Sequence, residues 1–274
     1  IQFVHDQTIR NINLGLMPDE IAEKVILPTH LSNSLYLKEF YGKVNWSVKS
    51  VFAGYLGFFD GNPSTLLPLP LKEKAAKIIE LAGGFDALKQ KTVAAFTNKN
   101  YQWSLELTDY LLKIAPKNTE VIEVRYNSLL KLGEENSNPN ARHYYLTSAL
   151  ELKGLEMKLR PASAEIAEQL TLKSIFDGMA VNLIPEKSIY ENKKVNFFFP
   201  DIKEKWSVQV RYGIAEIQSF NIADSDISLE MNSNDWKKLA SGVDGGMGSY
   251  FSGNMNFKKG NLLAFKSFFD MFKN

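Results

Sequence analysis

Apolar residues in the first 150 positions recur every three or four residues, which is the period of amphipathic helices. The pattern is strongest in the aromatic-rich stretch 40–63, FYGKVNWSVKSVFAGYLGFFDGNP. It predicts a helix that Asn45 can cap and that stops at the turn sequence 60–63. Its broad apolar face contains Val48, Val51, Phe52, Tyr55, Leu56 and Phe59. Large aromatic residues anchor both cores and interfaces, so this face is either buried or turned toward a partner.

Shorter helices are expected before this stretch. The second of them has Ile21 and Val25 on its inner face, and the third runs from about 30 to 40. After the stretch, residues 61–70, GNPSTLLPLP, hold three prolines and cannot form the interior of a helix. This segment predicts either a surface linker or an arm that lies over a neighbouring subunit.

Five further helices are predicted between residues 71 and 151, separated by glycine, asparagine and proline. Their expected ranges are about 71–82, 85–98, 101–115, 119–132 and 138–151. The segment 85–118 has the length and layout of one tetratricopeptide-like helix pair, with Tyr101, Trp103 and Leu107 packed between its helices. Such pairs usually form surfaces for other proteins.

The hydrophobic period changes after residue 165. A helix to about 179 gives way to strict alternation of apolar and polar residues, which predicts antiparallel strands with one face on a core. The expected strands are 194–199, 206–212, 214–220, 227–231 and 254–258. The sequence therefore predicts an α+β protein. An all-helical domain spans 1–160, and a domain with about five antiparallel strands covered by helices spans 161–274, with the boundary near Gly154 and Pro161.

Composition narrows the choice of partners. The 274 residues are 45% hydrophobic and 23% charged, in the usual range for globular proteins. The net charge of +1 argues against nucleic acid or an anionic membrane as a partner. Cysteine is absent, which excludes disulfides, thiolate metal sites and cysteine nucleophiles. No apolar run reaches the length of a membrane-spanning helix.

The residues offer little catalytic chemistry. His5, His30 and His143 are far apart in sequence and none has a second ligand at metal-binding spacing, so we expect neither a histidine metal site nor a cofactor here. An all-carboxylate metal site stays open, although nothing points to one. No GxSxG motif marks a serine nucleophile. The glycine-rich run 244–248 lacks the lysine of a phosphate loop and predicts a flexible turn. We therefore expect no catalytic residue.

The second domain carries a signal for apolar ligands. Its strands place aromatic and branched residues on one face, and the closing helix adds several phenylalanines. So much apolar surface in a small domain predicts either dense packing or a cavity that encloses an alkyl chain. The candidate alkyl-binding residues are Phe197, Phe199, Trp206, Val208, Val210, Phe265 and Phe269.

Several segments resemble a known family. FVHDQTIRNINLGLMPDEIAEKVILP and YGKVNWSVKSVFAGYLGFFDGNP resemble the dimerisation domain of bacterial alkylsulfatases, and ELAGGFDALKQKTVAAFTNKNYQWSLELTDYLLKIAPKN is similar to its continuation. These enzymes are zinc-dependent hydrolases of the metallo-β-lactamase superfamily that act on alkyl sulfates such as dodecyl sulfate. WSVQVRYG, DISLEMNSNDWKKLASG and SGNMNFKKGNLLAFKSFFDMF resemble their C-terminal domain, which is similar to sterol carrier protein type 2.

The resemblance implies a homodimer, and it favours an interface role for the aromatic helix. The candidate interface residues are Trp46, Val48, Phe52, Tyr55, Phe58 and Phe59. It also implies that residues 161–274 bind an alkyl sulfate, a fatty alcohol or a lipid. The family's His-x-His-x-Asp-His zinc motif is absent from this sequence. Zinc and hydrolysis are therefore expected in an upstream metallo-β-lactamase-fold domain, which would be a further partner.

Two further expectations concern the context of the chain. It begins at Ile1 within a predicted helix, so we expect it to be a part of a longer protein. If the parent is like much of its family, it is periplasmic or secreted. The alternative function is a stand-alone lipid-binding protein or a protein-interaction scaffold.

Overall fold

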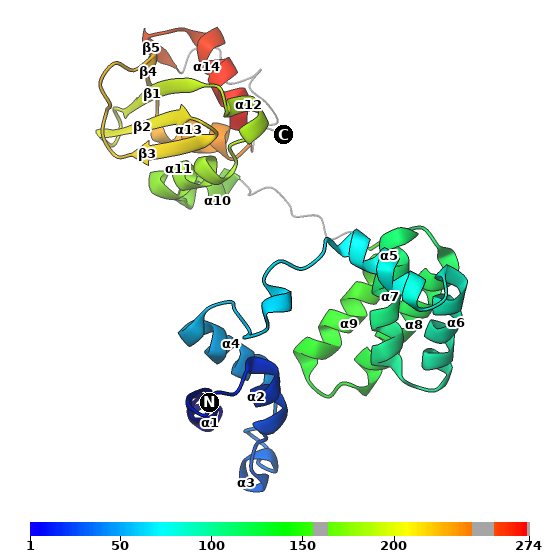
Figure 1. The fold of residues 1–274 in the computed structure, drawn as a ribbon. Coiled ribbons are helices and arrows are strands. Elements are labelled where there is room, and N and C mark those ends of the chain that lie inside the picture. The colour runs from blue at the N-terminus through cyan, green and yellow to red at the C-terminus, as the bar shows by residue number, and fades with distance from the viewer. Residues whose placement is uncertain (156–163, 243–254, 273–274) are drawn as a thin grey trace. The chain divides into compact units, whose positions relative to one another are not determined.

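The computed structural model describes residues 1–155, 164–242 and 255–272 (Figure 1). The chain divides into two compact units, residues 1–157 and 158–274. Pro161 and the glycine-rich run 244–248 lie outside the described residues. None of the helices in the described ranges combines the length and the hydropathy that a membrane-spanning helix needs.

The first part of unit 1 is a small helical cluster. Its helices are α1 (Gln2–Asn13), α2 (Pro18–Lys24), α3 (Thr29–Ser32) and α4 (Val44–Leu56). The shared core consists of Val4, Ile21, Val25, Val48 and Phe52, which confirms the predicted inner face of α2. Pro18 occupies the first turn of α2, and Glu20 accepts a hydrogen bond from the backbone N–H of Met17 at 2.8 Å. This arrangement satisfies a free N–H at the helix start and fixes where α2 begins.

The predicted helix over 30–40 is mostly absent, because α3 ends at Ser32 and the chain is irregular from there to α4. Distant side chains hold this segment. Asn138 donates to the backbone carbonyls of Glu39 and Gly42, and Asn140 donates to that of Tyr41 at 2.7 Å. The expected cap of α4 also differs: Lys43 is the N-cap residue, and the Glu39 carboxylate accepts from the Val44 N–H at 2.6 Å.

The second part of unit 1 contains a short 3₁₀ helix, η1, and five α-helices. They are η1 (Pro63–Thr65), α5 (Leu71–Leu81), α6 (Phe85–Thr97), α7 (Tyr101–Ile114), α8 (Thr119–Glu135) and α9 (Pro139–Leu152). The α-helices agree closely with the predicted ranges. Asparagine side chains fix the start of two of them: Asn118 caps α8 and Asn138 caps α9. Successive helices from α6 to α9 contact each other, as in tetratricopeptide-like pairs. Leu107 is buried as expected, whereas Trp103 is 48% exposed.

Unit 2 is built on one sheet with the strand order β3-β2-β1-β4-β5 (Figure 1). Its strands are β1 (Asn192–Phe199), β2 (Glu204–Arg211), β3 (Ile214–Gln218), β4 (Ile227–Glu230) and β5 (Asn256–Lys259). The helical elements are α10 (Ala164–Gln169), α11 (Leu172–Val181), α12 (Pro185–Ser188), α13 (Ser233–Ala240), α14 (Leu262–Phe269) and the 3₁₀ helix η2 (Asp270–Phe272). Alternation along the strands buries one face of the sheet, which confirms the α+β prediction.

One pair of strands departs from the predicted antiparallel arrangement. β4 runs parallel to β1, with Val195 beside Ile227. Parallel neighbours need a crossover, and the chain after β3 returns past β2 and β1 to reach β4. Asn196, on the outer face of β1, binds this crossover: its Nδ2 donates to the Ile222 carbonyl at 2.9 Å and its Oδ1 accepts from the Ile222 N–H at 3.0 Å. The antiparallel prediction is wrong for this pair, because alternation reveals the faces of a strand and not its direction.

Candidate dimer surface and alkyl-binding cavity

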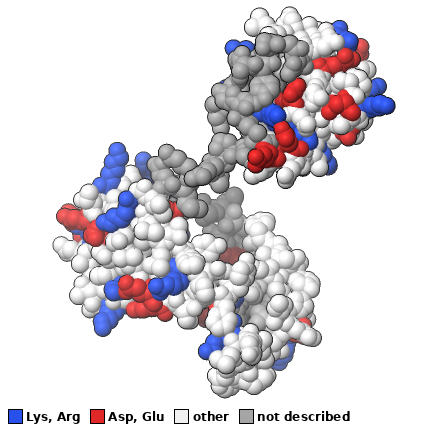
Figure 2. All heavy atoms as spheres, turned by 180° about the vertical axis from the view of Figure 1, so that it is seen from behind, with Lys and Arg blue, Asp and Glu red and all other residues white. Residues whose placement is uncertain are grey.

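Exposed apolar side chains are concentrated at the start of unit 1. About half of the large hydrophobic residues that are exposed in the described ranges lie within residues 1–71, about a quarter of the chain. On the face seen in Figure 2, the α1–α4 cluster presents a broad surface with few charged side chains. Isolated exposed hydrophobics are normal, but a large contiguous apolar surface indicates a binding site.

The aromatic helix α4 has two different faces. Val48 and Phe52 point into the cluster core and are buried. Trp46 and Tyr55 on the helix remain accessible, as do Phe58 and Phe59 after it. The helix ends at Leu56, earlier than the predicted stop at 60–63, because Gly57 caps it with a φ of +83°. The inner face of α4 contributes to the core of the cluster, whereas its outer face and the residues that follow it present large aromatic side chains of the kind that anchor protein interfaces.

Hydrogen bonds hold one of these aromatics in position. The Tyr55 hydroxyl lies 3.0 Å from His5 Nε2, and the two rings are 5.8 Å apart at a tilt of 54°. His5 Nδ1 lies 2.9 Å from an Asp6 carboxylate oxygen. A restrained side chain loses less conformational entropy when another surface covers it, so this network lowers the entropic cost of covering Tyr55.

The turn after α4 is also structured. The Asp60 carboxylate accepts hydrogen bonds from the Thr65 hydroxyl at 2.7 Å and from the Asn62 N–H at 2.9 Å, and these bonds hold the pKa of Asp60 below its usual value. Gly61 has a φ of +85° and packs against Met17, where a side chain would lie 2.3 Å from the sulfur. The FDGNP sequence therefore fixes the direction in which the chain leaves α4.

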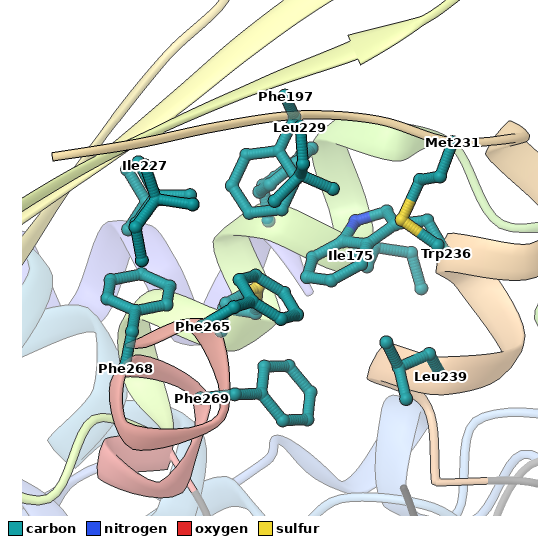
Figure 3. Close-up of a cluster of buried hydrophobic side chains, with 14 of the residues drawn as sticks. Ile175, Phe197, Ile227, Leu229, Met231, Trp236, Leu239, Phe265, Phe268 and Phe269 are labelled. Carbon is teal, nitrogen blue, oxygen red and sulfur yellow. The ribbon is translucent and has the colours of Figure 1, made fainter. Parts of the chain in front are cut away.

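The core of unit 2 is a dense aromatic cluster. Phe176 of α11 lies at its centre, stacked on Trp206 at 5.0 Å and in contact with Phe197, Phe199 and Trp236. Figure 3 shows Phe197 from the sheet, Trp236 from α13 and Phe265 and Phe269 from α14 pointing toward one another.

A cavity of about 490 Å³ opens beside this cluster. It lies between α11, α13 and the end of α14, and its volume falls in the range of small-molecule pockets. Apolar side chains form much of its wall, and no charged side chain lines it within the described residues. Its lining residues are Leu170, Ser174, Ile175, Gly178, Met179, Asn182, Leu239, Ala240, Ser241, Gly242, Phe269 and Phe272.

The structure places most candidate alkyl-binding residues in the core next to the cavity. Phe197, Phe199, Val208, Val210 and Phe265 are buried in the cluster, and Trp206 packs partly buried against it. Phe269 alone among the candidates lines the cavity.

Sequence reasoning missed the lining residues on α11 and α13. Ile175 and Met179 stand four positions apart on α11, with the small Gly178 beside them. This spacing is a detectable signal of an apolar helix face, but it does not distinguish a cavity wall from ordinary core packing.

Potential metal-binding side chains are dispersed over the described residues. Within the described residues, no cluster of three or more His, Asp or Glu side chains could hold a metal ion. His5, His30 and His143 lie on α1, α3 and α9, respectively. The residues described therefore do not fit a zinc site.

Comparisons with known proteins identify the family. A family model described as alkyl sulfatase dimerisation matches residues 17–154, and one described as alkyl sulfatase C-terminal matches residues 160–274. A linear primary-alkylsulfatase from a Pseudomonas strain is 34% identical over 99% of this chain and 54% of its own length. An alkyl/aryl-sulfatase of Saccharomyces cerevisiae is 29% identical over 84% of this chain and 36% of its own length. The chain thus spans about half or less of the curated relatives it matches.

A solved structure agrees with these matches. A stereoselective inverting sec-alkylsulfatase from Pseudomonas superposes with a TM-score of 0.88 at 26% identity, covering 99% of this chain and 43% of the other. The matches confirm the resemblance that the quoted sequence segments carry. This chain belongs to the alkyl sulfatase family, of which it carries the dimerisation and C-terminal domains.

Proposed function

We propose that this chain is the assembly and alkyl-binding part of an alkyl sulfatase. Unit 1 joins two copies into a homodimer, and unit 2 holds the alkyl chain of a sulfate ester such as dodecyl sulfate, or of the alcohol released from it. The single observation that supports the proposal best is the concentration of exposed apolar side chains in residues 1–71, most of which fall within the match of residues 17–154 to a dimerisation family model.

Dimerisation would give this apolar surface a partner. Covering an exposed apolar side chain stabilises a complex by roughly 25 cal/mol per Å² removed from water. A twofold axis applies each contact twice, and it closes the assembly at two copies. A tight dimer would also keep surfactant molecules away from the apolar surface that a separated copy would offer them.

The cavity of unit 2 supports binding of an alkyl chain. Burying an alkyl chain favours binding by about 0.8 kcal/mol per methylene group, and the loss of the chain's conformational freedom opposes it. Before that loss is subtracted, burial of a chain of ten carbons favours binding by several kcal/mol. A sulfate group is an anion that costs too much to bury without a charged partner, and the described lining offers none. The alkyl tail would therefore occupy the cavity while the sulfate or hydroxyl head stays at its mouth.

Hydrolysis belongs to the other part of the proposed enzyme. The residues described here do not fit a zinc site, so the proposal places zinc and the catalytic residues in a metallo-β-lactamase-fold domain upstream of this chain. Sulfate release from dodecyl sulfate by this chain with added zinc is expected to be absent. Release of sulfate by the purified chain alone would contradict this part of the proposal.

Alkyl binding can be tested with decanol. Trp236 contacts Phe269, a cavity-lining residue, at a ring distance of 5.9 Å, so its fluorescence should change when decanol binds. The matched variant is Gly178→Leu. Position 178 lies in α11 with open space around it, so leucine would fill the cavity and also remove a flexible residue from a helix. We expect this variant to be as stable as the original chain or more so, and to lose the decanol response. An unchanged response would contradict the assignment of the cavity.

A further inference from the structure

A pocket of about 350 Å³ lies on unit 2 where β2 begins and β3 ends. The strand register forms it, because Gln218 at the end of β3 lies opposite Ser207, and the next residues of the chain therefore lie beside the start of β2. The pocket is lined by Lys203, Glu204, Lys205, Trp206, Ser219 and Phe220. None of these residues lines the cavity between α11, α13 and α14, so the pocket is a separate space.

Two lysines without a carboxylate partner border this pocket. The described residues give Lys203 and Lys205 no ion-pair partner, whereas Lys258 of β5 binds a carboxylate at 3.1 Å. Glu204 is the acidic residue in the described lining, and its carboxylate accepts a hydrogen bond from the indole N–H of Trp206 at 2.8 Å. Two lysines against one glutamate give the described lining a net charge of +1, and a positive pocket attracts anions.

Aromatic side chains give the same pocket an apolar side. Trp206 is partly buried and stacks on Phe176 in the core of unit 2 at a ring distance of 5.0 Å, so its indole is a fixed wall. Phe220 is 57% exposed. Cations beside an aromatic surface are complementary to an anionic head group that is joined to an alkyl chain, because the cations bind the charge and the rings pack against apolar groups.

The loop before β2 holds Lys203 in an unfavourable backbone conformation. Its φ of +57° lies in the left-handed region, where glycine fits without the steric cost that a side chain brings. The loop is anchored by Asp201, whose carboxylate accepts hydrogen bonds from the Ser233 hydroxyl at 2.6 Å and from the Ser233 N–H at 3.1 Å. A lysine at a position that favours glycine indicates a role for its side chain.

We propose that this pocket is a second ligand site of unit 2, which binds an alkyl sulfate by its anionic head. The sulfate lies between Lys203 and Lys205, and the first methylene groups pack against Trp206 and Phe220. The interior cavity, whose described lining has no charged side chain, suits an alkyl tail or an uncharged alcohol instead. The inference takes its ligand class from the proposed function but stands on a different set of residues. Unit 2 would therefore distinguish the sulfate ester from the alcohol by charge.

The indole N–H signals of the chain test this site directly. The chain has four tryptophans, so a ¹⁵N–¹H correlation spectrum contains four such signals, and Trp206→Phe and Trp236→Phe assign the two in unit 2. The probes are octyl sulfate, below the concentration at which it forms micelles, and octanol as its uncharged match. We expect octyl sulfate to shift the Trp206 signal, and octanol to shift the Trp236 signal while that of Trp206 stays in place. The Gly178→Leu variant, which fills the interior cavity, should keep the response of Trp206 to octyl sulfate.

Lysine variants separate the effect of charge from that of packing. Lys203→Gly removes the cation and relieves the left-handed backbone, so this variant should fold about as stably as the original chain. We expect it to raise the Kd for octyl sulfate about threefold to fivefold, and Lys203→Gly/Lys205→Gln to raise it about tenfold, with both effects weakened by added salt. Lys259→Gln is the matched control, because Lys259 is an exposed lysine of β5 outside the pocket, and it should change the Kd by less than about twofold.

The possible outcomes separate this site from the interior cavity. A Trp206 signal that octyl sulfate leaves in place, or an equal Kd for the double lysine variant and the original chain, would overturn the second site and leave the proposed cavity intact. A Trp206 response to octanol as large as that to octyl sulfate would show apolar recognition alone, and would also overturn it. A Trp236 signal that no alcohol shifts, beside a Trp206 signal that responds to octyl sulfate, would support the second site and count against the cavity.

Discussion

Phe58 offers a sharp test of the dimer surface. It follows α4, its side chain is 88% exposed, and it belongs to no hydrophobic cluster among the described residues. Phe58→Ala therefore removes little from the interior of one copy and should leave the stability of a separated copy unchanged. In a symmetric dimer that covers this residue, the same substitution removes two buried phenylalanine side chains.

The size of the effect follows from this geometry. Burying one phenylalanine side chain is worth about 1.5–3 kcal/mol relative to leaving it exposed. Two copies of the contact give about 3–6 kcal/mol, which corresponds to an increase of about two to four orders of magnitude in the Kd of the dimer. Partial coverage of the ring would place the measured value at the lower end of this range.

Sedimentation equilibrium over a wide range of concentrations measures that Kd. Thermal unfolding followed by circular dichroism, at a concentration where both proteins are monomeric, checks the stability of the separated copy. Leu81→Ala is the control, because it removes a similarly exposed apolar side chain from α5. A Kd for Phe58→Ala within threefold of the original value, or an equal loss with Leu81→Ala, would refute the reasoning.

Three further predictions concern contacts that hold the two units in shape. Asn138→Ala removes the hydrogen bonds to the Glu39 and Gly42 carbonyls and the cap of α9, so urea unfolding should show a loss of about 1–3 kcal/mol in unit 1. Gly61→Ala should also destabilise unit 1 in urea unfolding, because the φ of +85° at this position and its contact with Met17 disfavour a side chain. An unchanged urea midpoint of unfolding would contradict this prediction. Burial raises the pKa of Asp201, but the hydrogen bonds that its carboxylate accepts from Ser233 outweigh this effect, and the pKa is lowered. The ionised carboxylate therefore stabilises unit 2 at neutral pH, and this contribution should be lost as the pH falls through the lowered pKa, below about 4. Asp201→Asn should cost about 0.5–1 kcal/mol at pH 7 and flatten this acid dependence, and equal acid sensitivity in both proteins would contradict the assignment.

The helices of unit 1 could be read from the sequence because their start and stop signals are local. Asn118 and Asn138 cap α8 and α9 through their own side chains, three residues from the N–H groups they accept from. The irregular segment before α4 could not be read in this way. Its backbone is bound by Asn138 and Asn140, about a hundred residues away, and a local pattern contains no information about such a partner.

The aromatic helix shows a second limit of pattern reading. Its periodicity correctly predicts a broad apolar face, but Val48 is buried within one copy whereas Tyr55 is exposed. Both residues are apolar enough for a core, so the pattern cannot distinguish a side chain that packs inside one copy from one that stays on its surface. Only the exposed fractions in the folded chain make this distinction.

The sheet domain shows the same limit for cavities. Alternation correctly placed Phe197 and Val208 on the inner face of the sheet. The cavity, however, is lined mainly by α11, α13 and the end of α14, where Ile175 and Leu239 face a space that their neighbours do not fill. Unfilled space depends on how three helices meet, and the spacing of apolar residues along one helix does not encode it.

The most direct test of the account is the mass of this chain in solution. One copy has a mass of 31.0 kDa. Static light scattering coupled to size exclusion at micromolar concentration is predicted to give twice that mass, because the proposed dimer covers the exposed apolar surface of residues 1–71. A mass of one copy at every concentration up to the solubility limit would contradict the account.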